Sequence, residues 1–299
     1  MASDNLGASA IHLIAGAERG DFRALAQLLT LLEREGPKLL KAHPILLKPK
    51  RPAFRVGITG PPGAGKSTLI SQLIRQLRSQ GKRVGVLAVD PSSPYSQGAI
   101  LGDRIRYSEH FNDAGVFIRS LGTRGSLGGL SASAYLMLRA YDLAAFDIVL
   151  IETVGVGQTE LEVVNVADFV AVVLVPESGD SVQGMKAGLL EIADLYVVNK
   201  SDRPGAEIFL RELEAALHLG ETGSAARCLA MVATKGQGVV EFLSVVAAAA
   251  VAADWQAARL DPARLRLEAS ALLRIDSERV IAERVSQISS PDDFAKIFN

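Results

Sequence analysis

Residues 60–67 read G-P-P-G-A-G-K-S, and this stretch constrains the fold more than any other. It matches the pattern G-x-x-x-x-G-K-[S/T], which is typical of loops that bind nucleotide phosphates. Glycines let backbone N–H groups turn toward the phosphates. We expect Lys66 to reach the β- and γ-phosphates and the Ser67 hydroxyl to bind Mg²⁺. The residues predicted to hold the phosphates are Gly60, Pro61, Pro62, Gly63, Ala64, Gly65, Lys66, Ser67 and Thr68.

Both flanks of this loop have the pattern that such a site needs. Residues 54–59 read F-R-V-G-I-T and predict a short buried strand. After the loop, apolar residues recur at helical spacing, and Gly81 is a suitable stop. A glycine-rich turn with a solvated lysine is the alternative, and the strand–loop–helix context disfavours it. The apolar residues of the predicted helix are Leu69, Ile70, Leu73, Ile74 and Leu77.

Further strand-like runs alternate with helical patterns along the rest of the chain. Continuous Val, Ile and Leu runs between helices predict an α/β fold with a doubly wound, mostly parallel sheet that is covered on both faces. The predicted strands are 84–89, 116–119, 148–152, 169–175, 195–199 and 229–232, and the predicted helices are 131–141, 185–193, 206–217 and 239–253.

We divide the chain into three predicted parts. Residues 1–52 form an N-terminal helical extension and linker, 53–254 the nucleotide domain, and 255–299 a C-terminal helical arm. The first part is helical from 11 to about 40, with a break at Gly36-Pro37. Asp261-Pro262 is a good start for the last helix. The arm either folds back on the core or pairs with a second subunit.

The composition excludes several classes of protein. The net charge is −1, so neither a nucleic acid nor an anionic membrane is expected as a partner. The single cysteine, Cys228, excludes an intramolecular disulfide framework and fits a reducing cytoplasm. We see no secretory leader, and the apolar run 245–253 is too short for a membrane span.

Residues 199–202 read N-K-S-D and directly follow a predicted strand. The Asp202 carboxylate can accept both the N1–H and the 2-amino group of guanine, a donor pair that adenine lacks. We expect Asn199 to contact the acceptor edge of the base and the Lys200 stem to lie along the ring. With the phosphate loop in the correct order, this motif favours GTP over ATP. A plain surface turn is the alternative.

Two acidic residues end predicted strands. Asp90 follows 84–89, and Glu152 ends 148–152 and precedes T-V-G. Ligands of doubly wound sheets lie beyond the carboxyl ends of the strands, so both carboxylates should face the γ-phosphate and Mg²⁺. Gly155 is expected to donate its N–H to the γ-phosphate, and Glu152 to act through a metal-bound water. For each acid, a strand-end cap is the alternative.

Loops rich in glycine and charge lie between these strands, at 102–104 and 122–125. We expect them to become ordered when a γ-phosphate is bound. Asp103 could complete the Mg²⁺ shell, and Arg104 or Arg124 could stabilise charge in the transition state. A solvated surface charge is an equally good interpretation of either arginine.

Together these motifs resemble the P-loop GTPases of the MeaB/ArgK type, the methylmalonyl-CoA mutase-associated GTPase chaperones. The resemblance runs from about 56 to 238. It is carried by G-P-P-G-A-G-K-S-T, A-V-D-P-S-S at 88–93, I-L-G-D-R at 100–104, F-I-R at 117–119, L-G-G at 127–129, I-E-T-V-G-V-G-Q at 151–158, D-S-V-Q-G-M-K at 180–186 and V-N-K-S-D at 198–202.

The resemblance implies a homodimeric GTPase that gates adenosylcobalamin loading of a cobalamin-dependent acyl-CoA mutase, with slow hydrolysis that the mutase accelerates. It implies a third switch at 180–186. It assigns base reading to Asn199, Lys200 and Asp202, with Ala233 and Thr234 in the loop behind the base. The metal and catalytic positions that it implies are Ser67, Asp90, Asp103 and Glu152, beside Lys66, which the phosphate-loop motif itself predicts as a catalytic residue.

The chain departs from the family pattern at three places. Ser201 replaces an alanine, which is a minor change. The loop behind the base reads V-A-T-K at 232–235 where Ser-Gly or Ser-Ala is usual, so base affinity or dissociation could differ. Ser181-Val182 stands in the third switch where an acid followed by Leu is commoner, which bears on the coupling to a partner.

Three other functions stay open at this point. A small-molecule kinase or transport-associated ATPase would need an acceptor pocket, and N-K-x-D argues against ATP. A GTP-dependent metallochaperone would need a Cys/His motif, which one cysteine and four scattered histidines do not supply. A nucleotide sensor without turnover is the third.

Overall fold

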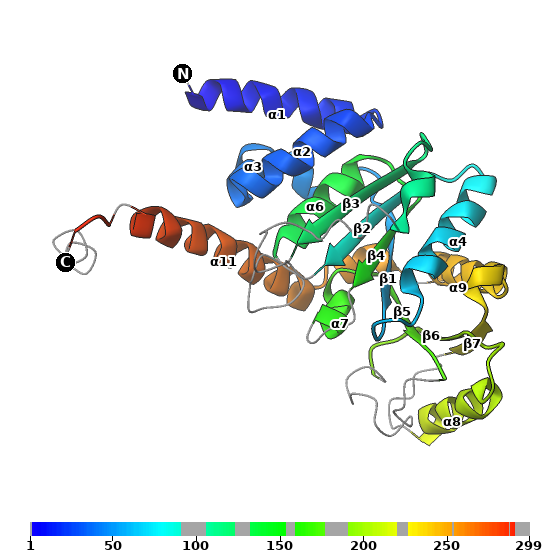
Figure 1. Cartoon of the computed structure of the whole chain (residues 1–299). Coiled ribbons are helices and arrows are strands. Elements are labelled where there is room, and N and C mark those ends of the chain that lie inside the picture. Colours follow the sequence, from blue (N-terminus) through cyan, green and yellow to red (C-terminus); the bar gives the residue numbers. More distant parts are fainter. Residues whose placement is uncertain are drawn as a thin grey trace. The chain divides into compact units, whose positions relative to one another are not determined.

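The structure is a computed structural model, and it describes residues 2–90, 106–122, 132–153, 159–176, 191–219, 227–252, 254–286 and 288–290. The chain forms two compact units (Figure 1). One unit, the sheet unit, comprises Arg51–Leu130 and Ala145–Arg259. The other, the helical unit, comprises Met1–Lys50, Ser131–Ala144 and Leu260–Asn299.

Within the described residues, the sheet unit is built on seven strands in the order β3-β2-β4-β1-β5-β6-β7. Every strand pair of this sheet is parallel. This confirms the predicted parallel α/β fold. The strands are β1 (Phe54–Thr59), β2 (Val84–Asp90), β3 (Val116–Gly122), β4 (Ile148–Thr153), β5 (Phe169–Leu174), β6 (Leu195–Asn199) and β7 (Arg227–Met231).

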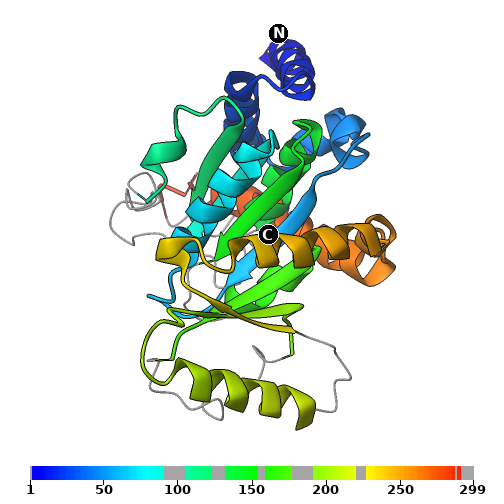
Figure 2. The ribbon, with the colours of Figure 1, turned by 90° about the vertical axis from the view of Figure 1, so that its right-hand side faces the viewer.

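Both faces of the central strand β1 are covered. Val56 and Ile58 belong to the core that the helices α4 (Lys66–Ser79) and α9 (Val239–Ala252) share with the sheet. Gly57 points to the other face, where an added Cβ would collide with Val163 of the 3₁₀ turn η3 (Val163–Asn165). A strand buried on both sides favours apolar residues, and β1 departs from this only at Arg55 and Thr59, which are buried polar residues, and at Gly57. At the end of the sheet, α8 (Ala206–Leu219) lies beside β7 (Figure 2).

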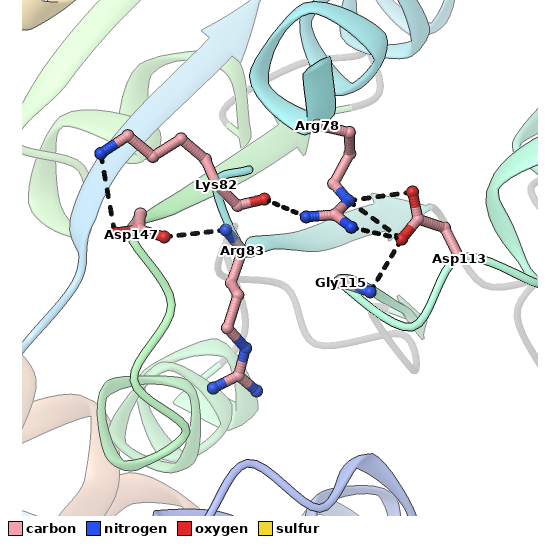
Figure 3. Close-up of polar contacts among 6 residues, drawn as sticks. All are labelled: Arg78, Lys82, Arg83, Asp113, Gly115 and Asp147. Atoms are coloured by element: carbon pink, nitrogen blue, oxygen red, sulfur yellow. Dashed lines mark hydrogen bonds and ion pairs between the residues drawn. The ribbon is translucent and has the colours of Figure 1, made fainter. Parts of the chain in front are cut away.

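Partly exposed charged side chains hold the segments that lead into β2, β3 and β4 (Figure 3). Asp147 accepts a hydrogen bond from the backbone N–H of Arg83 at 2.8 Å. The Arg78 guanidinium, at the end of α4, binds both oxygens of Asp113 at 2.9 Å and donates to the carbonyl of Lys82 at 2.7 Å. These bonds tie the residues before β2 and β3 to the helix that follows the phosphate loop.

The sheet unit extends past the boundary that we predicted at 254. Trp255–Arg259 forms the short helix α10, and the Trp255 ring packs edge-on against Phe54 with 5.5 Å between ring centroids. Arg259 forms an ion pair with the buried carboxylate of Asp168, its Nε 2.7 Å from Oδ1. This short segment therefore groups with the sheet unit, and the change of sequence character after Trp255 is not a change of unit.

The helical unit joins segments that are far apart in the sequence. The helix α6 (Ala132–Leu143), which follows β3 in the chain, groups with the terminal helices rather than with the sheet unit. Within the unit, Arg139 of α6 forms a bidentate ion pair with Glu268, at 2.8 and 2.7 Å. The other elements are α1 (Ala2–Glu18), α2 (Phe22–Glu35), α3 (Pro37–Ala42), η1 (Pro44–Leu47) and α11 (Pro262–Ser286).

Helix ends follow the local capping chemistry. Asp261 caps α11, accepting from the N–H of Ala263 at 2.8 Å, as the sequence predicts. The N-terminal helix has a second break that we did not predict. Asp21 accepts from the N–H of Arg23 at 2.8 Å and starts a new helix there. In the predicted helix 185–193, residues 185–190 lie outside the described residues, and 191–193 are not helical. Among the helices described, none is long and apolar enough to span a bilayer.

Candidate nucleotide-binding site

The phosphate loop lies between β1 and α4, as predicted. Gly60 has φ +134°, and a Cβ there would collide with the carbonyl of Val173 on β5. Gly65 has φ +91°, and a Cβ there would collide with the side-chain amide of Asn199. Positive φ and these close approaches both require glycine. The two glycines of the motif thus hold the loop against strands β5 and β6.

Lys66 is the first residue of α4, and its side chain curls back over the loop. Only 7% of the residue is exposed. Its Nζ donates to the carbonyls of Gly60 at 2.7 Å and Pro61 at 2.9 Å. The positive charge therefore lies at the N-terminus of a 14-residue helix, where the helix dipole also favours anions.

Glu152 lies beside the phosphate loop at the end of β4 and is 3% exposed. Its Oε1 accepts from the Ser67 hydroxyl at 2.6 Å, and its Oε2 accepts from the Tyr107 hydroxyl, also at 2.6 Å. The structure thus brings together Ser67 and Glu152, two of the residues that the sequence analysis names as metal positions. Tyr107 was missed, because a lone tyrosine outside any periodic pattern gives no signal in the sequence.

The other predicted metal and switch residues are less well defined. Asp90 ends β2, whose register pairs Ala88 with Glu152 on β4, so both acids lie at the same edge of the sheet. The structure does not describe the Asp90 side chain. Asp103, Arg104, Arg124, Gly155 and the segment 180–186 lie outside the described residues. Among the residues described, no group of three His, Cys, Asp or Glu side chains could hold a metal ion.

A cavity of about 560 Å³ opens beside the phosphate loop. Arg106 also lines this cavity, and its guanidinium Nη1 lies 3.3 Å from the Ser67 Oγ. The sequence motifs pointed only to Arg104 and Arg124 as arginines that could stabilise charge in the transition state. The cavity is lined by Pro62, Gly63, Gly65, Lys66, Ser67, Thr68, Ser71, Gln72, Arg75, Arg106, Glu109, Glu152 and Thr153.

Asn199 connects the phosphate loop to the loop that follows β7. Its Nδ2 donates to the carbonyl of Ala64 at 2.8 Å, and its Oδ1 accepts from the N–H of Ala233 at 3.0 Å. The Asn199 side chain is buried, so these two hydrogen bonds take the place of bonds to water for the Ala64 carbonyl and the Ala233 N–H. Asn199 therefore has a structural task beside the base contact that the sequence predicts.

Asp202 lies at the exposed end of the site. Its Oδ2 is 2.9 Å from the Nζ of Lys235, and the two side chains are 41% and 58% exposed. The hydrogen bond from Lys235 lowers the pKa of Asp202 below its usual range, so the carboxylate stays ionised. Lys235 is a residue of the atypical loop 232–235, and the sequence did not reveal this pairing.

A second cavity of about 190 Å³ lies at this end. Gly65 and Thr68 line both cavities, so the phosphate end and the base end share a wall. All five residues predicted to read or back the base line the smaller cavity. Its lining is Gly65, Thr68, Asn199, Lys200, Asp202, Arg203, Val232, Ala233 and Thr234.

Comparison with known proteins agrees with this geometry. The family model described as "Methylmalonyl Co-A mutase-associated GTPase MeaB" matches residues 25–288. A Pyrococcus horikoshii protein whose name describes it as a GTPase is 49% identical over 240 residues, covering 77% of this chain and 74% of its own. The mouse protein "Methylmalonic aciduria type A homolog, mitochondrial" is 40% identical over 205 residues, covering 64% and 49%.

Solved structures show the same fold. A crystal structure described as "LAO/AO transport system kinase" has a TM-score of 0.62 and 26% identity, and covers 97% of this chain and 89% of its own. The family model spans most of the chain, and the match to the Pyrococcus relative covers more than two thirds of both proteins. The chain therefore belongs to the MeaB family of methylmalonyl-CoA mutase-associated GTPases.

Proposed function

We propose that the chain binds GTP across the two adjacent cavities, hydrolyses it to GDP and phosphate, and thereby gates adenosylcobalamin loading of a cobalamin-dependent acyl-CoA mutase. The observation that carries the GTP part is the side chain of Asn199, which ties the phosphate loop to the base loop beside Asp202. The mutase part is supported by the description of the family.

Lys66 and the loop amides would hold the phosphates. The ammonium already lies over the loop, bonded to two of its carbonyls, so a small rotation of the side chain would turn it toward a β- or γ-phosphate. Gly155, from the following loop, is proposed to donate to the γ-phosphate. Neutralising the phosphate oxygens favours in-line attack by water, because the transition state spreads its charge over them.

The oxygen donors at the sheet edge fit Mg²⁺, a hard cation that prefers hydroxyl, carboxylate and water ligands. Ser67 and Glu152 are within hydrogen-bond distance of each other, and Asp90 ends the neighbouring strand. We propose that these three residues and Asp103 hold the ion, Glu152 through water. When bound, Mg²⁺ would neutralise charge on the β- and γ-phosphate oxygens.

At the other end, Asp202 would accept the two N–H groups of guanine. Lys235 occupies one of its oxygens, which retains a second lone pair, so the ion pair can persist beside the base. Lys200 has φ +57°, a left-handed conformation that is uncommon outside glycine and directs the chain around this cavity.

We propose that a partner mutase accelerates a slow basal reaction by binding one state of the loops at 92–128, 153–159 and 177–188 better than the other. A cytoplasmic homodimer is part of this proposal. It is supported by apolar side chains exposed along α11, within the arm predicted at 255–299. These are Leu265, Leu267, Leu273, Val280, Ile281 and Val285.

A second candidate is a kinase or transport-associated NTPase. It is favoured by one observation, the likeness to the structure described as a transport system kinase. A kinase would transfer the γ-phosphate to an acceptor other than water. Release of inorganic phosphate from GTP without an added acceptor distinguishes the two.

The proposed function is tested by GTP hydrolysis with and without a purified cobalamin-dependent acyl-CoA mutase from the same source. We expect a slow basal rate that rises about tenfold or more with the mutase, as other GTPases respond to partners that complete their sites. An unchanged rate with every such mutase would refute the chaperone part and leave the GTPase part standing.

A further inference from the structure

Glu152 is a buried carboxylate held from two sides. Burial of an ionised carboxylate is costly unless its oxygens accept hydrogen bonds. Ser67 supplies one donor, to Oε1, and Tyr107 supplies another, to Oε2. The two donors differ in their position. Ser67 lines the phosphate cavity together with Glu152, whereas Tyr107 is fully buried and is not part of the cavity wall.

Tyr107 is itself fixed, because the residues after it are anchored on α4. Glu109 pairs with Arg75 and accepts from the Ser71 hydroxyl. His110 is buried with its Nε2 2.8 Å from the same Ser71 Oγ. The helix that starts at the phosphate loop therefore also holds the segment that carries Tyr107.

A second anchor lies one turn further along α4. Arg78 binds both oxygens of Asp113 (Figure 3). With these anchors, the Tyr107 hydroxyl has little freedom to leave Glu152. The Ser67 hydroxyl, in contrast, is the group that a loop of this type turns toward a bound metal ion.

We propose that Tyr107 is a positioning residue: it holds Oε2 of Glu152, so that Oε1 faces the phosphate cavity when Ser67 turns to the metal. The inference rests on the proposed function, since it gives Glu152 its orientation for the same reaction. Tyr107 acts through Glu152 and touches neither the nucleotide nor the water.

The competing interpretation is that Tyr107 only fills the core, to which its ring belongs. Tyr107→Phe separates the two, because it keeps the ring and removes only the hydroxyl. We expect the single-turnover rate of GTP hydrolysis to fall about tenfold, the usual order for one hydrogen bond to a charged group. GTP affinity in EDTA should stay within about twofold, and the Mg²⁺ concentration for half-maximal rate should rise severalfold.

Two further variants make the result decisive. Tyr196→Phe removes another buried phenol hydroxyl from the sheet unit, on β6 away from Glu152, and should leave the rate and the Mg²⁺ dependence unchanged. In a Glu152→Gln background, Tyr107→Phe should add no further loss, because its effect passes through that carboxylate.

An unchanged rate and Mg²⁺ dependence in Tyr107→Phe would overturn the proposal. So would an equal loss in Tyr107→Phe and Tyr196→Phe, or full additivity with Glu152→Gln. If the wild-type protein hydrolyses no GTP at all, the proposed function fails by itself. The Mg²⁺ dependence of GDP binding then tests Tyr107, and a severalfold shift in the variant would support its role.

Discussion

The phosphate end and the base end of the site are built in different ways. At the phosphate end, Lys66 and Glu152 are almost fully buried, and glycines at positive φ hold the loop against the sheet. At the base end, Asp202 and Lys235 form an exposed ion pair. Exposed pairs contribute little to stability, whereas buried groups are costly to leave unpaired.

Because of this difference, we expect the phosphate end to determine the affinity for nucleotides and the base end to determine which base is preferred. Changes at the phosphate end should alter affinity for every nucleotide and, where they leave buried groups unpaired, the stability of the sheet unit. Changes at the base end should alter only the choice between bases. Asn199 bonds to both loops, so its loss should lower the affinity for every nucleotide and the stability of the sheet unit.

The largest effect is expected from Lys66→Ala. Removal of the ammonium leaves the phosphates without their main cation, so GTP and ATP affinity should each fall by about a hundredfold or more. Calorimetric titration measures both. Lys82→Ala is the control, because this half-exposed lysine lies in the same unit and pairs with Asp147 at 4.0 Å. Unchanged GTP affinity in Lys66→Ala would refute the assignment of the phosphate site.

Asn199→Ala should break the connection between the two ends. It leaves the Ala64 carbonyl and the Ala233 N–H without these partners, which should lower the free energy of unfolding by about 2 kcal/mol. The affinity for every nucleotide should fall by a similar factor. Asn199→Asp keeps the acceptor for Ala233 and loses the donor to Ala64. Its loss of unfolding free energy should therefore differ in size from that of Asn199→Ala. Denaturant unfolding and titration of both variants measure this, and wild-type stability in Asn199→Ala would contradict the structural task.

Asp202→Asn should change selectivity without changing stability. An amide cannot accept both guanine N–H groups, so the ratio of GTP to ATP affinity should fall at least about tenfold. The amide can instead donate to the C2 carbonyl of xanthine, so XTP binding should rise. The gain for XTP rules out a folding defect as the cause. An unchanged GTP to ATP ratio would mean that the base is read elsewhere.

Lys235→Met tests the exposed ion pair and should have a smaller effect. Lys235 lowers the pKa of Asp202, and the carboxylate must be ionised to accept from guanine. Without Lys235 the pKa of Asp202 returns toward its usual range. On acidification, GTP affinity should therefore begin to fall at a higher pH in the variant than in the wild type, between about pH 4 and 5. At neutral pH the affinity should change by less than about fivefold. An identical pH dependence of GTP affinity in both proteins would show that Lys235 does not lower the pKa of Asp202.

The smallest effect is expected from His110. Burial lowers its pKa, against the raising influence of Glu109 and Asp113, while Arg75 adds to the lowering. The unfolded chain then binds a proton at higher pH than the folded one, so stability rises with pH and is lost below about pH 6.5, by at most about 1.4 kcal/mol per pH unit.

His110→Gln should make the pH dependence of the unfolding midpoint shallower between about pH 7 and 5.5. His12→Gln is the matched control, since His12 is exposed in the helical unit. An equally steep dependence in His110→Gln would assign the acid sensitivity to other groups.

The two motifs of the site could be predicted because each is local. The phosphate loop and N-K-x-D place their residues by short fixed spacing at strand ends, and in the structure they line two adjacent cavities that share Gly65 and Thr68. Tyr107 and Lys235 could not be predicted, since each acts on a residue far away in the sequence. The same limit applies to α6, which groups with the terminal helices through contacts such as Arg139–Glu268.

The strands were predictable for a related reason. Burial on both faces makes β1, β4, β5 and β6 rich in apolar residues, so their positions were predicted correctly to within one residue. The break at Asp21 was missed, although residues 18–21 read E-R-G-D and interrupt the apolar pattern: Gly20 has φ +81°, and the Asp21 side chain caps the new helix.

The central claim is that one site with two ends selects a guanine nucleotide. Calorimetric titration of the wild-type protein with GTP, GDP, ATP and XTP in Mg²⁺ tests it most directly. We expect one guanine nucleotide per chain and an affinity for GTP at least about a hundredfold higher than for ATP, because ATP would leave Asp202 without its two donors. Equal affinity for GTP and ATP would contradict the account.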